Sequence, residues 1–299
     1  MTGAPGLERR RAREGQLAIL VAATAWSTAG LAQRGLDASP ATQVTGRAAF
    51  AAVALFGFVL AAERRGTLRA FRRMGRSGLA MAAFLAISSG SFLLALNYTT
   101  VANVLFMQAA APMMAALLGW VLLSEPVDGR TWVALVLAAA GVALMAAGSF
   151  DAGTTAVVLP LVVTASFAAV IVIARHRREV SMMPATFASQ LIVIAAFLPF
   201  LDVGSASRSD WAILAALGVG QMGIGLAFLT IGARLIPPAQ VAIISLLEVV
   251  LGPLWVWLAY DERPGASTLA GGAIVVAAVL VQALGSATSA PVAAGEAHA

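Results

Sequence analysis

The chain has 299 residues, of which 60% are hydrophobic and only 11% are charged, and its mean hydropathy is +0.90. Soluble domains use about 45–50% apolar and 25% charged residues, so this composition excludes a soluble globular protein and predicts one that crosses a membrane repeatedly. The net charge of +5 does not indicate nucleic-acid binding, because the arginines gather beside apolar segments. Cysteine is absent, which excludes disulfides and cysteine-ligated metal sites.

Ten apolar segments are each long enough to cross about 30 Å of hydrocarbon as a helix. We predict an all-α membrane bundle, because a β-barrel would show segments of about ten residues with alternating hydropathy. In chain order the predicted spans are 16–33, 43–62, 78–96, 101–123, 131–148, 155–174, 184–201, 211–233, 237–258 and 267–284.

A basic segment, residues 9–13, precedes the first span. No small-residue cleavage pattern ends this span, so we expect a retained helix and not a signal peptide. With the N-terminus inside and ten crossings, the inner segments hold 15 arginines and the outer segments hold four, and the chain has no lysine. This bias predicts a multi-pass protein of the cell inner membrane with both termini in the cytoplasm. The four outer arginines are Arg34, Arg47, Arg208 and Arg263.

The sequence resembles itself at an offset of 137 residues. Residues 94–103 align with residues 231–240, and the same offset places Ser124-Glu125 on Asp261-Glu262. Two halves of five spans must enter the membrane in opposite orientations, because five is odd, and such inverted repeats place a substrate site between them near the midplane. The predicted division is an N-terminal segment 1–15, a first five-helix repeat 16–149, a second five-helix repeat 150–284 and a disordered cytoplasmic tail 285–299.

Three segments of the first half, ALNYTTVAN at 95–103, Ala111-Pro112 and LLSEP at 122–126, resemble the signature of the EamA-type members of the drug/metabolite transporter superfamily. In the second half, residues 246–262 resemble the matching family segment. The family usually has proline after the glutamate, but Val249 follows Glu248 here and Pro253 comes four residues later, which leaves the bend of the ninth helix open. The resemblance implies a ten-helix exporter with a central cavity and alternating access, with aromatic amino acid exporters among the nearer relatives.

Polar residues recur on matching helices of the two halves. Asn103, Met107 and Gln108 on the fourth span correspond, at the same offset, to Gln240, Ile244 and Ser245 on the ninth. Each set falls on neighbouring positions of one helical face. We predict that these residues line a wet cavity between the halves; the alternative is that their amides only link helices to one another.

Glu248 lies near the middle of an apolar run, 237–258. A carboxylate at that depth is a functional candidate, which would bind the amino group of a zwitterionic substrate or carry a proton. The alternative is a neutral, buried carboxyl group that donates one hydrogen bond within the bundle. At an offset of 141, Trp26 matches Phe167, and this ring pair would stack on an aromatic or apolar substrate, or else fill a helix interface.

Four glycines between 218 and 225 surround Gln221 in the eighth span. They predict a close helix approach or a kink, and Gln221 joins the predicted substrate-binding residues. The histidines are His176 and His298 alone, so no HExxH metal site or Ser-His-Asp triad fits within the membrane, and we expect no enzyme activity, no cofactor and no metal.

The function that the sequence favours is export of amino acids, aromatic and other apolar ones preferred, or of similar small metabolites, by a monomer in the lipid bilayer. The alternative within transport is a broad-range drug/metabolite efflux carrier that couples to protons through Glu248. The alternative outside transport is a membrane receptor or scaffold, which would not need a polar stripe in both halves.

Overall fold

The computed structural model describes residues 4–124, 126–149, 152–176, 183–232, 235–236 and 238–288. Glu125 of the repeated acidic turn, the arginines at 177, 178 and 234, and the tail beyond residue 288 lie outside these ranges. Within the described ranges the chain forms helices and no strand, and ten stretches are long and apolar enough to cross a membrane. The predicted all-α fold with ten membrane spans is therefore confirmed.

The helices follow one another with short connections. In the first half they are α1 (Ala4–Ser27), α2 (Ala29–Arg34), α3 (Pro40–Glu63), α4 (Thr67–Tyr98), α5 (Val101–Gln108), α6 (Ala111–Leu123) and α7 (Gly129–Ser149). In the second half they are α8 (Thr154–His176), α9 (Met183–Phe197), α10 (Arg208–Ala215), the π-helical segment η5 (Ala216–Ile224), α11 (Gly225–Gly232), α12 (Pro238–Tyr260) and α13 (Ala266–Thr288). Short 3-10 turns at Arg64–Gly66, Leu198–Phe200 and Val203–Ser205 complete the described elements.

Polar side chains at the helix starts explain several of these boundaries. Ser39 accepts a hydrogen bond from the backbone of Thr42 at the start of α3, and Thr100 accepts one from Asn103 at the start of α5. Ser207 and Asp210 bond each other's backbone N–H groups at the start of α10, which is a capping box. These bonds satisfy backbone donors that the first helical turn would otherwise leave without partners.

The first, fourth and eighth spans are each divided. The first changes from α1 to α2 at Ser27 and Thr28, whose hydroxyls donate to the carbonyls of Thr24 and Ala25. Such bonds back to the preceding turn bend helices. The eighth span becomes π-helical over Ala216–Ile224, and a Cβ added to Gly218 would lie 2.7 Å from the backbone of Ala51, so the close helix approach that the glycine cluster predicted is present. A π-helical segment inserts an extra residue per turn and is frequent at functional sites.

Two helix ends differ from the predicted spans. α4 begins at Thr67 rather than near residue 78, with a kink at Gly75, whose φ of 54° is open to glycine at little cost. The basic residues before the kink therefore form a helical turn of their own at the end of the span. α13 continues to Thr288, so the first residues of the predicted tail, 285–288, are helical.

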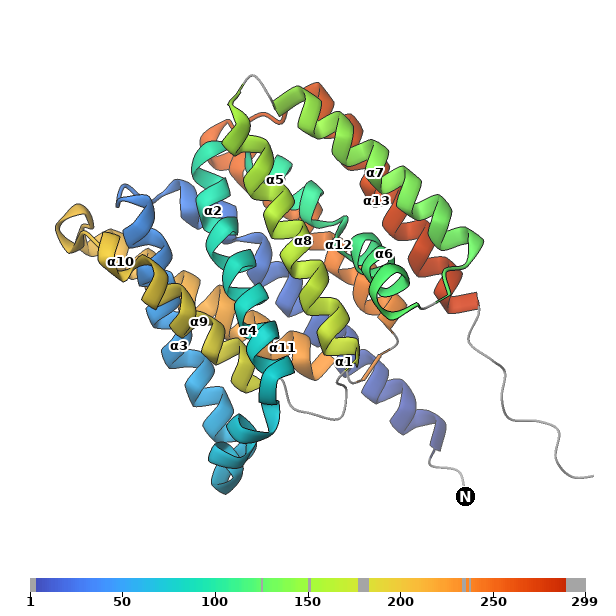
Figure 1. Ribbon diagram of the computed structural model, residues 1–299, viewed down its shortest axis with the longest axis horizontal. Coiled ribbons are helices and arrows are strands. Elements are labelled where there is room, and N and C mark those ends of the chain that lie inside the picture. Colours follow the sequence, from blue (N-terminus) through green and yellow to red (C-terminus); the bar gives the residue numbers. More distant parts are fainter. Residues whose placement is uncertain are drawn as a thin grey trace, which may run out of the picture.

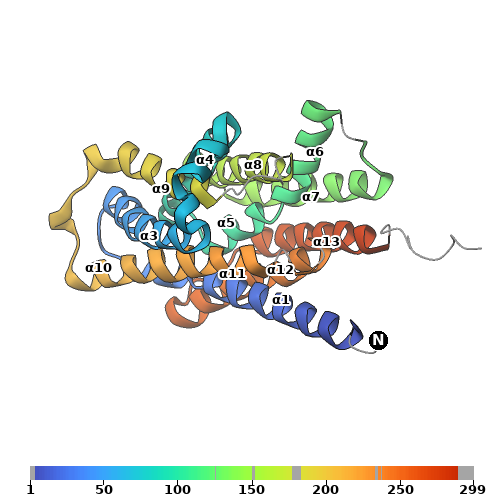
Figure 2. The same cartoon turned by 90° about the horizontal axis from the view of Figure 1, so that it is seen from below.

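The bundle joins the two halves through pairs of helices that lie far apart in the sequence (Figures 1 and 2). α1 packs along α12, and α7 packs along α13. At the second contact, a Cβ added to Gly141 would lie 2.6 Å from the carbonyl oxygen of Gly271, so only glycine permits this approach. The start of α1 and the end of α13 lie on the same side of the bundle in both views.

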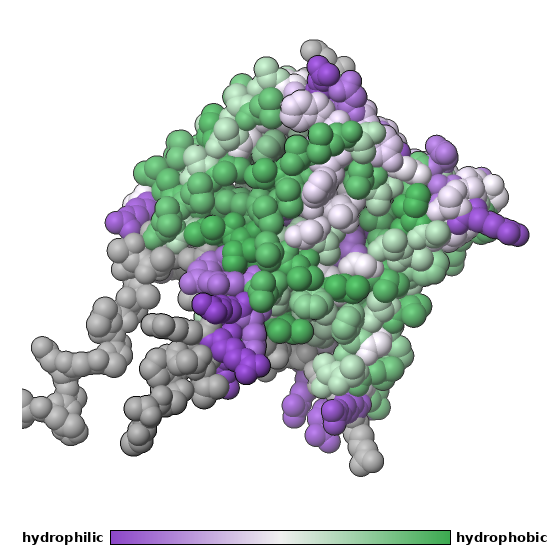
Figure 3. Space-filling view, turned by 180° about the vertical axis from the view of Figure 1, so that it is seen from behind, coloured by the Kyte–Doolittle hydropathy of each residue, from purple (hydrophilic) through white to green (hydrophobic). Residues whose placement is uncertain are grey.

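The surface has the pattern of a protein surrounded by lipid. In Figure 3, apolar residues cover most of the face and hydrophilic residues gather toward its edges. Large apolar side chains such as Val53, Leu122 and Leu258 are more than two-thirds exposed. In water such an extensive apolar surface would drive aggregation, whereas hydrocarbon solvates it.

Candidate functional site

A cavity of about 490 Å³ lies between the two halves, at the junction of α1, α5, α6, α8, α11, α12 and α13. Its size falls within the range of about 300–1,000 Å³ that is typical of small-molecule sites. Most of its lining is aliphatic, and the lining residues that the structure describes include no arginine, lysine or histidine. Its aromatic and polar lining residues are Trp26, Gln108, Phe167, Ser245, Glu248 and Gln282.

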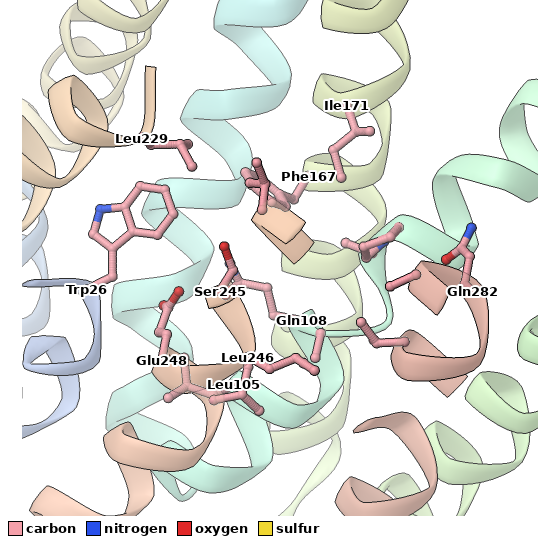
Figure 4. Close-up of a pocket in the computed structure, with 17 residues that line it drawn as sticks. Trp26, Leu105, Gln108, Phe167, Ile171, Leu229, Ser245, Leu246, Glu248 and Gln282 are labelled. Atoms are coloured by element: carbon pink, nitrogen blue, oxygen red, sulfur yellow. The ribbon is translucent and has the colours of Figure 1, made fainter. Parts of the chain in front are cut away.

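Five of the nine predicted substrate-binding residues line this cavity, namely Trp26, Gln108, Phe167, Ser245 and Glu248. Figure 4 shows Trp26 and Phe167 on either side of the space into which the hydroxyl of Ser245 points, with the carboxylate of Glu248 near the indole ring of Trp26. The arrangement puts two apolar ring surfaces and one acidic group around a common space.

Four pairs related by the 137-residue offset meet in the cavity, and two of them include a polar residue. These two are Gln108 with Ser245 and Ala111 with Glu248. The other polar pair, Asn103 and Gln240, is absent from the lining. The polar stripes that the sequence predicted therefore converge over one helical turn and not along their whole length.

The other predicted residues lie away from the cavity lining. Asn103 is fully buried and donates to the hydroxyl of Thr99 at 3.1 Å, and Met107 is fully buried in the packing between α5, α7 and α13. Gln240 is exposed and accepts a hydrogen bond from Gln16 at 3.2 Å. Gln221 faces Arg47 on α3, 3.5 Å from its guanidinium. In this conformation Asn103 and Gln240 link neighbouring groups, as the alternative interpretation of the stripes expected.

Glu248 has no cationic partner among the residues that the structure describes. Within the described part of the chain, no side chain or backbone group forms an ion pair or a hydrogen bond with its carboxylate. The group is partly buried and faces the cavity. A carboxylate in such an apolar setting is stabilised by a proton, by water or by a cationic ligand, and the cavity gives each of them access.

The backbone beside the cavity differs between the two halves. α5 ends at Gln108 and α6 begins at Ala111, and Pro112 cannot donate a backbone hydrogen bond. At this break the carbonyl oxygen of Met107 accepts the backbone N–H of Ala110 at 3.1 Å and the hydroxyl of Thr164 at 3.0 Å. At the equivalent place in the second half, Val249 keeps its N–H and α12 runs unbroken through Glu248. The family departure at Val249 thus coincides with a continuous ninth span.

Sequence reasoning missed two polar residues. Gln282 lines the cavity from α13, but its partner at the 137-residue offset is Met145, so a search for matched polar pairs could not find it. Arg47 was assigned to an outer segment, and this assignment is wrong: it lies within α3 and is only 2% exposed. Its guanidinium donates to the carbonyl and the hydroxyl of Ser89, at 2.9 and 2.5 Å. The sequence signal for its burial was the position of Arg47, seven residues after the start of an apolar helix.

The ten-span helical bundle with a cavity between its halves defines a polytopic membrane protein built around a small-molecule site. Comparison with known proteins makes this class specific. The model of the EamA-like transporter family matches the chain twice, over residues 13–147 and 154–284. The chain belongs to the EamA-like transporter family and is a membrane transporter of small molecules.

Two further comparisons agree with this assignment. The chain is 27% identical over 271 residues to an uncharacterized transporter of Archaeoglobus fulgidus, an alignment that covers 90% of this chain and 96% of the relative. A solved crystal structure superposes with a TM-score of 0.65 at 20% sequence identity and covers 90% of this chain and 97% of that one. The second likeness concerns the fold alone.

Proposed function

We propose that this transporter exports small apolar molecules that carry an amino group, with aromatic amino acids as the main class. The observation that carries the proposal is the position of Glu248, an acidic group without a cationic partner among the described residues, beside the ring of Trp26. An ammonium group would neutralise the carboxylate, and the indole ring would contact the apolar part of the substrate. Gln108, Ser245 and Gln282 would supply hydrogen bonds to its polar groups.

A second candidate is export of aromatic amines that lack a carboxylate, as a broader drug or metabolite efflux carrier would perform. It is favoured by the cavity lining, in which the described residues include no basic side chain that would pair with a substrate carboxylate. The same Glu248 would then alternate between the ammonium substrate and a proton, which is a common way for a transporter to couple the two.

Counterflow in proteoliposomes distinguishes the two candidates. The liposomes are loaded with unlabelled phenylalanine, tryptophan, leucine, phenethylamine or tryptamine, and entry of the matching labelled compound is followed. Accumulation of phenylalanine and tryptophan above leucine supports aromatic amino acid export. Accumulation of the two amines alone supports the second candidate, and accumulation of none of the five contradicts both.

We also propose that the two family matches form inverted repeats in the inner membrane, with both chain ends in the cytoplasm. Support comes from the excess of arginine in the predicted inner segments and from the odd number of spans in each half. The start of α1 and the end of α13 on one side of the bundle are consistent with it.

A further inference from the structure

The cavity is asymmetric along the bundle. Its lining on α12 begins at Val241, near the start of that helix, and ends at Val249. On α13 the lining residues Val279, Gln282 and Ala283 lie near the end of the helix. The cavity therefore extends toward the end of the bundle where α1 starts and α13 finishes, which we call the terminus end. The opposite end, where α2, the start of α5 and residues 261–263 meet, is here called the Arg34 end.

Between the cavity and the Arg34 end, α12 is in contact with α5 and α1. A Cβ added to Gly252 would clash with the side chain of Leu105, so α12 and α5 touch there. One turn further on, the indole N–H of Trp255 donates to the hydroxyl of Ser27 at 3.1 Å. Val256 is fully buried beside it. From Val249 to Tyr260, about 17 Å of helix length, α12 seals this side of the cavity against α1 and α5.

A cluster of polar contacts closes the Arg34 end itself. Nε of Arg34 lies 2.6 Å from Oε2 of Glu262, and Oε1 of the same carboxylate accepts the backbone N–H of Val101 at 2.8 Å. The remaining guanidinium nitrogens donate to the carbonyl oxygens of Leu96 and Thr99. Arg34 thus ties α2 to the end of α4, and Glu262 ties the connection after α12 to the start of α5.

These contacts join the two halves of the transporter. Arg34 and Val101 belong to the first family match and Glu262 to the second. The side chains are 24% and 19% exposed, whereas the neighbouring ion pair between Arg263 and Asp261 is 72% and 74% exposed. A partly desolvated, multiply hydrogen-bonded pair resists separation much more than an exposed pair, which water screens.

We propose that Arg34 and Glu262 form the gate that closes the transport route at this end. Transport requires the substrate to reach both sides of the membrane in turn, so the seal between the halves must open once in each cycle. The gate pair holds the seal through contacts that exist only when the halves are together here. Separation of Arg34 from Glu262 frees the start of α5 and the connection after α12. The contacts of Trp255 with Ser27 and of Gly252 with Leu105 then break, which opens a route to the cavity.

The absence of cysteine from the chain makes the test direct. Ser27→Cys places one thiol in the sealed layer, where the native side chain is fully buried. Ser245→Cys, in a second protein, places one in the cavity. Each is combined with Arg34→Gln or Glu262→Gln, and modification by a membrane-impermeant maleimide is timed from each side of oriented vesicles without substrate. Because no substrate is present, the result is independent of which compound the protein carries.

The expected result is that either gate variant speeds labelling of the thiol at position 27 from the Arg34 end at least about threefold, as the open population rises. Labelling of the thiol at position 245 from the terminus end slows in parallel. The matched control is Arg263→Gln, which breaks the neighbouring exposed ion pair with Asp261. This variant should leave the labelling rates at positions 27 and 245 unchanged. Equal labelling of position 27 with and without the gate variants overturns the proposal.

A third reporter separates gating from loss of fold. Met145→Cys lies in the fully buried contact of α7 with α13, away from the gate. If the gate variants expose positions 27 and 145 together, the pair stabilises the fold in general and the proposal is overturned. If position 27 alone becomes reactive, the gate is supported. Arg34→Lys keeps the charge but lacks the fork of donors, so its labelling rate should lie between those of the parent and Arg34→Gln.

Discussion

Gln108 and Ser245 stand at equivalent positions of the two halves of the sequence and line the same cavity. One residue lies at the broken end of α5 and the other on the continuous helix α12. The two halves therefore contribute a broken helix and a continuous helix to the same site. The functional consequences of this asymmetry centre on Glu248, which follows Ser245 by one helical turn.

Glu248→Gln should reduce transport at least about tenfold, because the substitution removes the one acidic group among the described lining residues while keeping its shape. Uptake into proteoliposomes is measured at acidic, neutral and mildly alkaline pH. Asp261→Asn, an exposed acidic residue outside the cavity, serves as the control and should transport normally. Wild-type rates for Glu248→Gln at every pH would show that the carboxylate binds neither substrate nor proton.

Trp26→Ala should weaken the transport of aromatic substrates more than that of leucine. A ring–ring contact contributes about 0.5–1.5 kcal/mol beyond simple burial, which corresponds to roughly a 2- to 12-fold rise in the apparent KM. Trp26→Phe retains a ring and should restore most of the affinity. Trp257→Ala, which removes a half-exposed indole on α12 outside the cavity lining, is the matched control. Equal losses for aromatic and aliphatic substrates would remove stacking from the explanation.

Gly218→Ala should destabilise the protein, because its new Cβ would meet Phe50, and the backbone of Arg47 and Ala51, at 2.5–2.7 Å. Overpacking of this kind costs about 1–3 kcal/mol. Gly220→Ala is the matched control in the same π-helical segment, where a Cβ would have nothing within 4 Å. Thermal unfolding in detergent should therefore show a lower Tm for Gly218→Ala only. Identical Tm values for the two variants would contradict the close contact between α3 and η5.

The proposed orientation predicts which side each loop faces. Val203→Cys, in an exposed turn before α10, should react with an impermeant maleimide on intact cells. Arg69→Cys, exposed in the basic turn before the Gly75 kink, should react only after the membrane is opened. Reaction of both thiols on intact cells, or of neither, would place the two loops on one side and refute the arrangement.

Hydropathy could predict the ten spans because every helix in a bilayer must satisfy its own backbone and present apolar side chains to lipid. The 137-residue offset could likewise indicate Gln108 and Ser245, since duplicated helices keep their facing positions. Neither hydropathy nor the offset shows which helical turns of a polar stripe reach the cavity. Asn103 and Gln240 share the face of Gln108 and Ser245, yet one bonds Thr99 in the interior and the other bonds Gln16 at an exposed position.

The amino-acid sequence by itself determined that this protein is an all-helical membrane protein with ten spans, and it predicted Trp26 and Glu248 near the centre, because composition and periodicity act along the chain. Tertiary structure alone decided that Arg47 is buried against Ser89, that Gln282 faces the cavity and that Arg34 meets Glu262, 228 positions away. Such pairings depend on which helices lie side by side and how each is rotated. The neighbours and rotation of each helix are set by the packing of many side chains, and this packing leaves no local pattern in the sequence.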